Sequence, residues 1–436
     1  MSDHFVSVVD LPEGGEKFDR SKVAGLSSIL LIVAAVGLAL SLILFFVSPE
    51  NYAYSWLFGF SVTFTITIGG MFWVLLHHAI NAGWGIAVRR IWENIGNLFP
   101  VLIFFGLPFF IPAVQNGLWE WMAEHRDVAH HIEEVVEAGG EGESLEYGLR
   151  HAHKELLYQK YEYLNIPFWV IRFLLFLVGP TAIWYFLQRY TFRQEKDGEL
   201  RHTFSARRLA CGGLPVFAVS LTFWAIDFLM ALDYGWFSTM WGVYIFAGAA
   251  WSSMAVAILV LNFLRKEGYL LKVTSDEHYH LMGKFLFAFT VFWAYIAFSQ
   301  FFLIWYANIT EETKFFHIRN SDGWWFVSIL LVFGHFVFPF VCLLMVWLKK
   351  NKKLIGLLCG WILFMHVVDL YWIIIPERGI SVGEPTLTSP LWWLGDIVAL
   401  ITFVASFAFL FLRGLDKRSL YPWRDPRLQE SANVTN

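Results

Sequence analysis

Residues 221–244 read LTFWAIDFLMALDYGWFSTMWGVY and place the carboxylate of Asp227 inside an apolar run that is long enough to cross a bilayer. A second carboxylate, Asp233, closes this run, and a short aromatic turn leads into the next one. An ionised carboxylate in hydrocarbon costs at least about 2.5 kcal/mol, so its side chain must face protein or water. The passage therefore predicts a spanning helix with a polar group of functional importance. The structural alternative is that Asp227 only pairs with a neighbouring helix.

The composition of the whole chain agrees with this passage. Of the 436 residues, 57% are hydrophobic, 19% are aromatic and only 16% are charged. Soluble domains carry about 25% charged residues, so the chain belongs to the membrane class. Its three cysteines form neither a Cys-x-x-Cys-His motif nor a cluster. If the protein works in a redox system, covalent haem and iron–sulfur clusters must therefore lie on partner subunits.

About ten apolar runs reach the length of about 20 residues that a spanning helix needs. They lie at 24–47, 55–81, 97–116, 165–187, 211–233, 241–264, 285–307, 323–348, 354–375 and 390–412. Barrel strands would instead show alternation over about 10 residues. The sequence therefore predicts an all-α polytopic membrane protein, and the first run reads as a retained helix rather than a cleaved signal.

The connecting loops differ in their content of Lys and Arg. One set carries Arg89, Arg90 and the basic run 349–353, whereas the opposite set carries few such residues. The positive-inside rule then places both termini in the cytoplasm, as an even number of spans also requires. We expect a cytoplasmic segment 1–23, a membrane domain 24–412 and a cytoplasmic tail 413–436.

The longest segment between spans, residues 117–165, lies on the outer side in this orientation and is rich in Glu and His. A solvated cap is the favoured interpretation, and a docking surface for a partner domain is the alternative. No histidine spacing in it is diagnostic of metal ligation, and the sequence predicts no metal site.

Spans two to five and six to nine resemble two copies of one four-helix unit. Asp227 and Asp369 lie deep in the last helix of each copy, and Pro180 and Pro339 lie in the helix before. The copies run in the same sense, which predicts two parallel-repeat bundles flanked by spans one and ten.

Each predicted bundle holds a cation or a histidine on one helix and a carboxylate on the next. Arg172 and Asp227 are the candidate pair in the first bundle. The candidate group in the second bundle comprises His335, His366 and Asp369. Membrane-embedded Asp, Glu and His are typical of proton relays. The alternative for each histidine is a hydrogen-bonded core residue.

Three further residues complete the set of proton-path candidates. Asp233 closes span five, Asp396 lies near the outer end of span ten, and His78 ends span two near the inner face. His78 could mark the inner mouth of a path, or it could belong to an interfacial helix end with basic anchors.

Two long motifs resemble the NrfD/PsrC-like membrane subunits of alternative complex III. They are residues 232–248, LDYGWFSTMWGVYIFAG, and residues 298–313, FSQFFLIWYANITEET. The segment from His78 through Trp84 to Arg90 is similar to the ActF-type subunit rather than to its ActC-type paralogue. The resemblance covers nearly all ten spans, but neither 117–165 nor the tail.

The resemblance implies a place in a quinol-oxidising complex of a bacterial cytoplasmic membrane. Its implied partners are a paralogous ten-helix subunit, a multihaem cytochrome c, an iron–sulfur protein, a monohaem cytochrome c, in some complexes a terminal oxidase, and lipids, but no nucleic acid. Haem c and iron–sulfur clusters would belong to those partners, and this chain would hold no cofactor except a quinol such as menaquinol.

The resemblance also directs attention to specific residues. The carried-over positions are Asp227, Asp369 and His366, and the quinone-pocket candidates are Trp305, Tyr306, Asn308 and Tyr244. No catalytic residue of a quinol site is transferred. Two other functions stay open: a membrane scaffold without chemistry, and a stand-alone ion or solute carrier.

Overall fold

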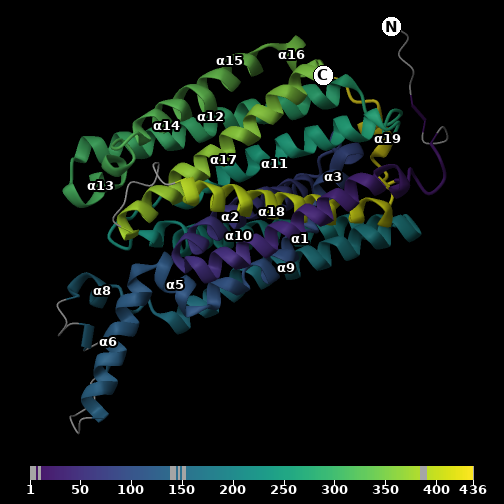
Figure 1. Cartoon of the computed structure of the whole chain (residues 1–436). Helices are drawn as coiled ribbons and strands as arrows, with labels where there is room; N and C mark the ends of the chain where they lie inside the picture. The colour runs from purple at the N-terminus through teal and green to yellow at the C-terminus, as the bar shows by residue number, and fades with distance from the viewer. Residues whose placement is uncertain are drawn as a thin grey trace.

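The computed structural model describes residues 6–7, 11–137, 144–145, 148–149, 154–382 and 390–435. In this part of the chain, ten helical segments are long and apolar enough to cross a membrane. The chain is thus an all-α polytopic membrane protein, as the sequence predicts (Figure 1).

The spanning elements follow the chain in order. They are α1 (Ala24–Val47), α2 (Pro49–Ala79), a broken third span of α3 (Ile86–Gly96), η3 (Phe99–Val101), α4 (Leu102–Phe105) and η4 (Leu107–Phe110), then α9 (Ile166–Asp197), α10 (Leu200–Phe228) with η5 (Met230–Leu232), α11 (Trp241–Lys266), α12 (Asp276–Ala307), α14 (Trp324–Leu330) with η6 (Leu331–Val337) and α15 (Phe338–Leu344), α17 (Lys352–Val382) and α18 (Pro390–Gly414).

Shorter elements connect these spans or lie at the ends of the chain. They are η2 (Arg20–Val23), α5 (Pro112–Leu118), α6 (Glu120–Glu137), α8 (Glu155–Gln159), α13 (Thr310–Ile318), α16 (Val346–Lys350), η7 (Leu415–Lys417) and α19 (Leu428–Ala432). Residues 138–143, 146–147 and 150–153 of the predicted outer insertion lie outside the described residues.

The third span departs most from its predicted bounds of 97–116. It runs from Ile86 to Phe110 and changes from α to 3-10 geometry near Pro100 and Pro108, because proline cannot donate the hydrogen bond that a continuous helix needs. The charges of Arg89 and Arg90 suggested a loop, but both lie buried inside α3. Their partners are carboxylates: Glu93 contacts both arginines, and Glu195 of α9 contacts Arg90.

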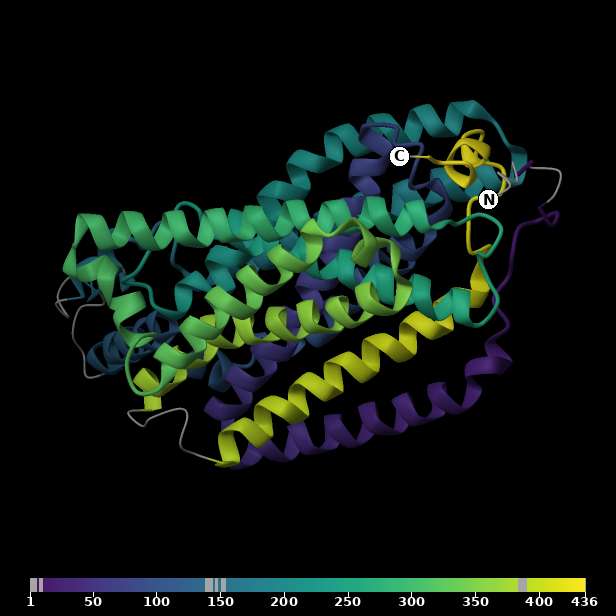
Figure 2. The same cartoon turned by 90° about the horizontal axis from the view of Figure 1, so that it is seen from above.

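The helices form two groups that meet along the centre of the molecule. In the first group, α10 packs on α2 and α9, and α2 packs on α3. In the second group, α11 packs on α12 and α17, and α15 packs on α12. The groups join where α2 contacts α11, while α1 and α18 run side by side along one edge and both contact α2 (Figure 2).

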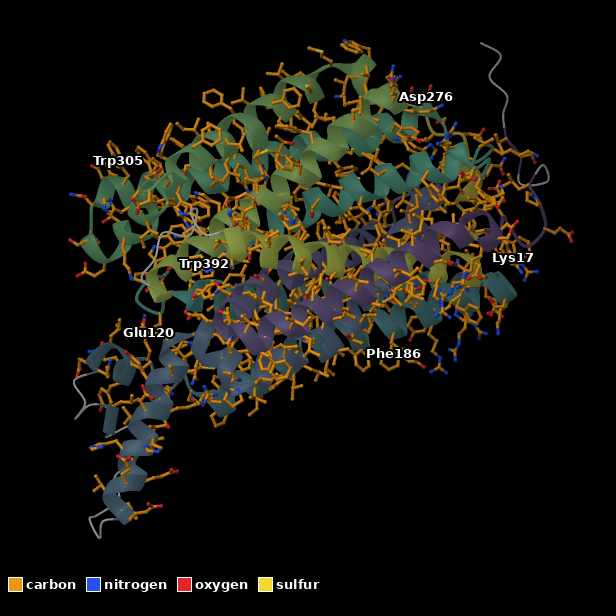
Figure 3. The ribbon with its side chains drawn as sticks, in the orientation of Figure 1. Lys17, Glu120, Phe186, Asp276, Trp305 and Trp392 are labelled. Carbon is orange, nitrogen blue, oxygen red and sulfur yellow. The ribbon has the colours of Figure 1, made fainter. Side chains whose placement is uncertain are left out.

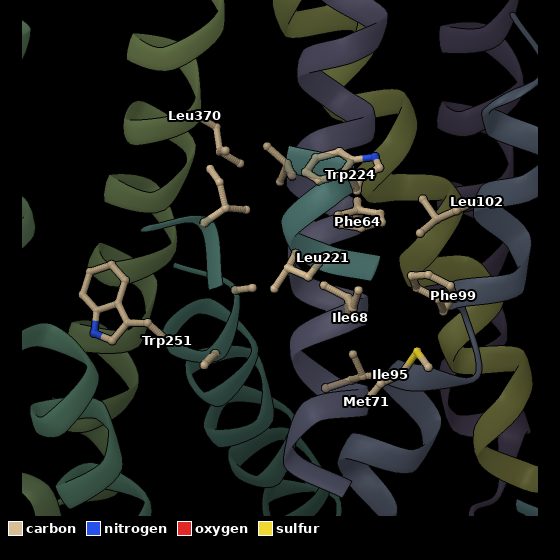
Figure 4. Close-up of a cluster of buried hydrophobic side chains, with 14 of the residues drawn as sticks. Phe64, Ile68, Met71, Ile95, Phe99, Leu102, Leu221, Trp224, Trp251 and Leu370 are labelled. Carbon is tan, nitrogen blue, oxygen red and sulfur yellow. The ribbon is translucent and has the colours of Figure 1, made fainter. Parts of the chain in front are cut away.

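The α2 helix forms the centre of this core. In its most apolar stretch of 18 residues, 83% of the residues are buried. The ring centroid of Phe64 on α2 lies 3.7 Å from that of Trp224 on α10 (Figure 4). A Cβ added at Gly69 would lie 2.1 Å from the carbonyl oxygen of Ala249 on α11. Glycine at this position therefore permits a close approach between the two groups.

Both chain ends lie at one end of the molecule, which we call the terminal end. Asn433 exchanges two hydrogen bonds of 2.8 Å with the backbone of Val6. Figure 3 shows Lys17 and Asp276 at this end, and Glu120, Trp305 and Trp392 toward the other end, which we call the opposite end. In the predicted orientation the opposite end faces outward.

Candidate functional site

A cavity of about 500 Å³ lies in the second helix group, toward the opposite end. Its wall is mostly aromatic and draws on α11, α12, α13, α14, η6 and α17. The lining residues are Trp241, Tyr244, Trp293, Ala294, Ala297, Phe298, Gln300, Phe301, Phe315, Phe316, Asn320, Ser328, Ile329, Leu331, Val332, Phe336 and Trp372. This size and an apolar wall with few polar groups are typical of small-molecule sites.

A buried carboxyl lies directly behind the cavity wall. The hydroxyl of Tyr244 donates a hydrogen bond to Oδ1 of Asp369, and the indole N–H of Trp293 donates to Oδ2 over 3.2 Å. Asp369 is only 2% exposed. Among the described residues no cation contacts this carboxyl, so it can take up a proton without breaking an ion pair.

One amide enters the cavity without a partner. Gln300 lines the cavity from α12 and is 6% exposed. Its Oε1 has no hydrogen-bond partner among the described residues. A buried polar atom that lacks a partner costs about 1–3 kcal/mol, so this position favours a ligand or water that can hydrogen bond.

His335 lies beside the same wall, in the π-helical segment η6. Its ring is stacked between Trp293, at a centroid distance of 3.7 Å, and Trp251, at 4.1 Å. Neither ring nitrogen has a hydrogen-bond partner within the described ranges. Short π-helical stretches inside α-helices occur frequently at functional sites.

The predicted group of His335, His366 and Asp369 is not joined by hydrogen bonds between its described side chains. His366 instead contacts the hydroxyl of Thr65 on α2 through Nε2, at 2.8 Å. Trp293 connects His335 with Asp369, because its ring stacks on His335 and its indole N–H donates to Asp369.

The predicted pair in the first group forms as expected. Nε of Arg172 lies 2.7 Å from Oδ2 of Asp227, and Nη2 lies 3.0 Å from Oδ1. The hydroxyl of Tyr163 also donates to Asp227, at 2.9 Å. Burial, together with the negative charge of Asp227, raises the pKa of Tyr163 above its usual range. The negative charge of Asp227 is therefore balanced by Arg172, and both of its oxygens accept hydrogen bonds.

Asp396 is compensated in the same way. Both of its oxygens accept from Arg378 of α17, at 3.0 and 2.9 Å. Ser55 donates to it over 2.6 Å and Tyr371 over 3.1 Å. The predicted ninth span ends at residue 375, before Arg378, so the sequence did not predict this pair, whereas α17 continues to Val382. The only available signal was that Arg378 and Asp396 flank the short connection between the last two spans.

The two remaining proton-path candidates lie away from the cavity. Asp233 forms an ion pair of 2.9 Å with Lys314 of α13. Burial opposes the ammonium charge, but the bond to Asp233 raises the pKa of Lys314. His78 is buried near the terminal end of α2, and its Nε2 has no hydrogen-bond partner in the part of the chain that the structure describes.

Of the four quinone-pocket candidates, the structure brings only Tyr244 to the cavity. Trp305 is 63% exposed and Tyr306 is 77% exposed at the end of α12. Asn308 adopts a left-handed conformation with φ of 52° and ends that helix. These three residues do not line this cavity, because α12 ends there and their side chains are exposed. Their assignment to a quinone pocket stays a prediction.

One trio of potential metal ligands occurs among the described residues, at the turn between α9 and α10. Asp197, Glu199 and His202 offer ligand atoms that lie within 4.8 Å of one another. Asp197 already contacts the backbone N–H of Glu199 at 3.0 Å and His202 Nε2 at 2.8 Å. These bonds account for the trio as the local structure of the turn.

No family model matches the chain, and no curated protein matches it.

Proposed function

We propose that this chain is the quinol-binding membrane subunit of a quinol-oxidising respiratory complex of the alternative complex III type, with an NrfD/PsrC-like origin. The observation that carries the proposal is the aromatic cavity whose wall includes Tyr244, hydrogen-bonded to Asp369. A flat aromatic ligand can pack against such a wall, and Tyr244 connects the cavity to Asp369, the proton acceptor behind the wall.

The proposed chemistry begins with the quinol in the cavity. Its oxidation releases two electrons and two protons. One hydroxyl proton passes to Tyr244 as the tyrosine proton passes to Asp369, which has no ion pair to lose. The second hydroxyl proton passes to water on the outer side of the membrane. The amide of Gln300 holds the other end of the quinol by a hydrogen bond. The electrons leave to haem and iron–sulfur groups on partner subunits, since this chain has no cysteine cluster to ligate them.

The location of the cavity supports proton release on the outer side. At about 1.5 Å per residue, Asp369 lies roughly 25 Å along α17 from Lys352 at the terminal end. In the orientation expected from Lys and Arg, this is the outer part of the membrane.

A scaffold function is the second candidate, and the first helix group favours it. The Arg172–Asp227 pair holds α9 to α10 and leaves neither carboxylate oxygen without a donor. Such a closed ion pair is suited to fixing helices rather than to passing protons. The two functions are compatible, because they reside in different helix groups.

The test measures quinol oxidation by the assembled complex with Asp369→Asn and Tyr244→Phe. Loss of a positioned proton acceptor lowers rates by about 10²–10⁴-fold. We expect such losses in complexes that still contain their haem. Asp227→Asn is the matched control, and we expect it to lower the yield of complex rather than the rate per haem.

Wild-type rates in both Asp369→Asn and Tyr244→Phe would rule out the quinol assignment. Loss of assembly in all three variants, with normal rates in what remains, would leave the scaffold function as the better account. Transport by the purified single chain in liposomes would instead favour a carrier.

A further inference from the structure

A second hollow, of about 520 Å³, lies at the terminal end between the last turn of α11 and the first turns of α17. We call it the basic groove. Its lining residues carry four cationic side chains, those of Arg265, Lys266, Lys352 and Lys353, and no carboxylate. An anionic ligand therefore meets no repulsion from the wall itself.

The four cations differ in how they are held. Arg265 donates to the carbonyl and hydroxyl oxygens of Thr274, and Lys352 lies 3.1 Å from a carboxylate oxygen of Asp276. The ammonium groups of Lys266 and Lys353 form no hydrogen bond or ion pair within the described residues. The groove thus combines two positioned cations with two that are available to a ligand.

The backbone of the groove is fixed by contacts between the two helices. Asn262 donates a 2.9 Å hydrogen bond to the carbonyl oxygen of Lys352. A Cβ added at Gly356 would lie 2.8 Å from Nδ2 of the same asparagine. The cations therefore project from a preformed junction of α11 and α17, not from a free loop.

An apolar strip continues from the groove toward the membrane centre. Leu357 is 65% exposed, and Phe364, seven residues further along α17, is 51% exposed on the same face. Between them, a Cβ added at Gly360 would meet no atom within 4 Å. The strip offers an acyl chain a surface next to the site where the cations gather.

We propose that the basic groove binds the phosphate headgroup of an anionic phospholipid, with one acyl chain along Leu357, Gly360 and Phe364. Basic pockets between spanning helices at the cytoplasmic face are suited to anionic lipid headgroups. The adjoining apolar strip distinguishes a phospholipid from free phosphate. This site is independent of the quinol cavity, which lies toward the opposite end.

The test uses the full chain in a neutral detergent and native mass spectrometry with added phosphatidylglycerol or phosphatidylcholine. We expect preferential binding of phosphatidylglycerol. The double substitution Lys266→Gln and Lys353→Gln should weaken that binding by about tenfold or more, since each cation near a lipid surface contributes on the order of 1 kcal/mol. The side chains of Lys266 and Lys353 are both exposed, so the melting temperature of the double variant should equal that of the unmodified chain.

The matched control is Arg189→Gln with Arg193→Gln. These two exposed arginines lie near the terminal end of α9, outside the groove, and removing them changes the net charge equally. We expect them to have no effect on lipid binding. Equal loss in both double variants, equal binding of the two lipids, or binding of inorganic phosphate that displaces the lipid completely would overturn the proposal.

Discussion

Asp227, Asp369 and Asp396 are all buried within the helix bundle, but their partners differ. Arg172 compensates Asp227 and Arg378 compensates Asp396, each through two hydrogen bonds. Asp369 receives only the donors of Tyr244 and Trp293. The sequence suggested Arg172 as the partner of Asp227, which lies on the next spanning helix. It did not show Arg378 as the partner of Asp396 or the donors of Asp369, because spacing shows depth but not which side chains meet.

The Arg172–Asp227 pair leads to a stability prediction. Arg172→Met leaves a buried carboxylate without its cation and should cost about 3–5 kcal/mol. The double variant Arg172→Met with Asp227→Asn removes both charges and should recover most of that loss. Thermal unfolding of the purified chain in detergent measures both. If the double variant is no more stable than Arg172→Met, the pair is not the origin of the cost.

Gln300 leads to a binding prediction. Its side-chain amide has no hydrogen-bond partner among the described residues and would bind one quinol oxygen. Gln300→Leu should therefore raise KM for quinol by about tenfold with little change in kcat. This pattern is expected when a contact is equally strong in the ground state and the transition state. Steady-state quinol oxidation by the assembled complex provides the measurement. A lower kcat at unchanged KM would place Gln300 in the chemical step instead.

At the scale of elements, helix existence follows from apolar run length, whereas helix ends and breaks do not. The α9 helix ends at Asp197 and the α12 helix begins at Asp276, so both extend beyond their apolar runs into charged residues. Tertiary partners make this possible, as with Arg90 and Glu195. The π-helical segment η6 packs against α12 and α17, and these contacts between distant parts of the chain are not visible in the sequence.

The contact between α2 and α11 predicts an overpacking effect. Gly69→Ala would force the Cβ against the backbone of Ala249, which cannot move like a side chain. We expect a destabilisation of about 1–3 kcal/mol. Gly360→Ala, at a position with open space, is the control and should leave thermal unfolding unchanged. An unchanged melting temperature for Gly69→Ala would refute this close approach of the two helix groups.

The α6 helix predicts a pH effect outside the membrane. Burial beside Trp121 and Tyr161 lowers the pKa of His125 to about 4. The unfolded segment, with an ordinary histidine pKa near 6.5, takes up a proton first. The stability that a neutral His125 contributes is therefore complete above about pH 6.5 and declines as the pH falls toward 4.

Hydrogen exchange of α6 at pH 7 and pH 5 measures this effect. We expect faster opening of the helix at pH 5, once the intrinsic pH dependence of exchange has been corrected. His125→Gln should remove the difference, and His131→Gln, at a side chain that is 76% exposed, should not. Equal behaviour of the two variants would show that His125 is not the responsible group.

At the scale of the whole molecule, the ten-span architecture was predictable, and the assembly of the site was not. The cavity combines residues from segments as distant in the chain as Tyr244 and Trp372. Helices in a membrane associate through close packing and hydrogen bonds rather than through hydrophobic burial alone. One sequence does not reveal which helix faces meet, so it could not show that Trp305, Tyr306 and Asn308 lie outside this cavity.

The C-terminal segment 418–436 contacts α3, and these contacts predict that it stabilises this helix. Asp425 lies 3.1 Å from Nη1 of Arg89, and Ser431 accepts from the backbone of Ala87 at 3.0 Å. Removal of residues 418–436 should lower the melting temperature and speed hydrogen exchange in α3. Removal of residues 434–436 alone is the control. Unchanged exchange in α3 after the longer truncation would show that the tail does not stabilise it.

The central claim is that the cavity behind which Tyr244 meets Asp369 accepts a quinol. Photolabelling of the assembled complex with an azido-quinone, followed by peptide mapping, tests it most directly. We predict labels on α12, α13 or α17 at residues that line the cavity, and their loss when excess quinol is present. Labels confined to partner subunits, or to helix faces outside the cavity and unaffected by quinol, would contradict the claim.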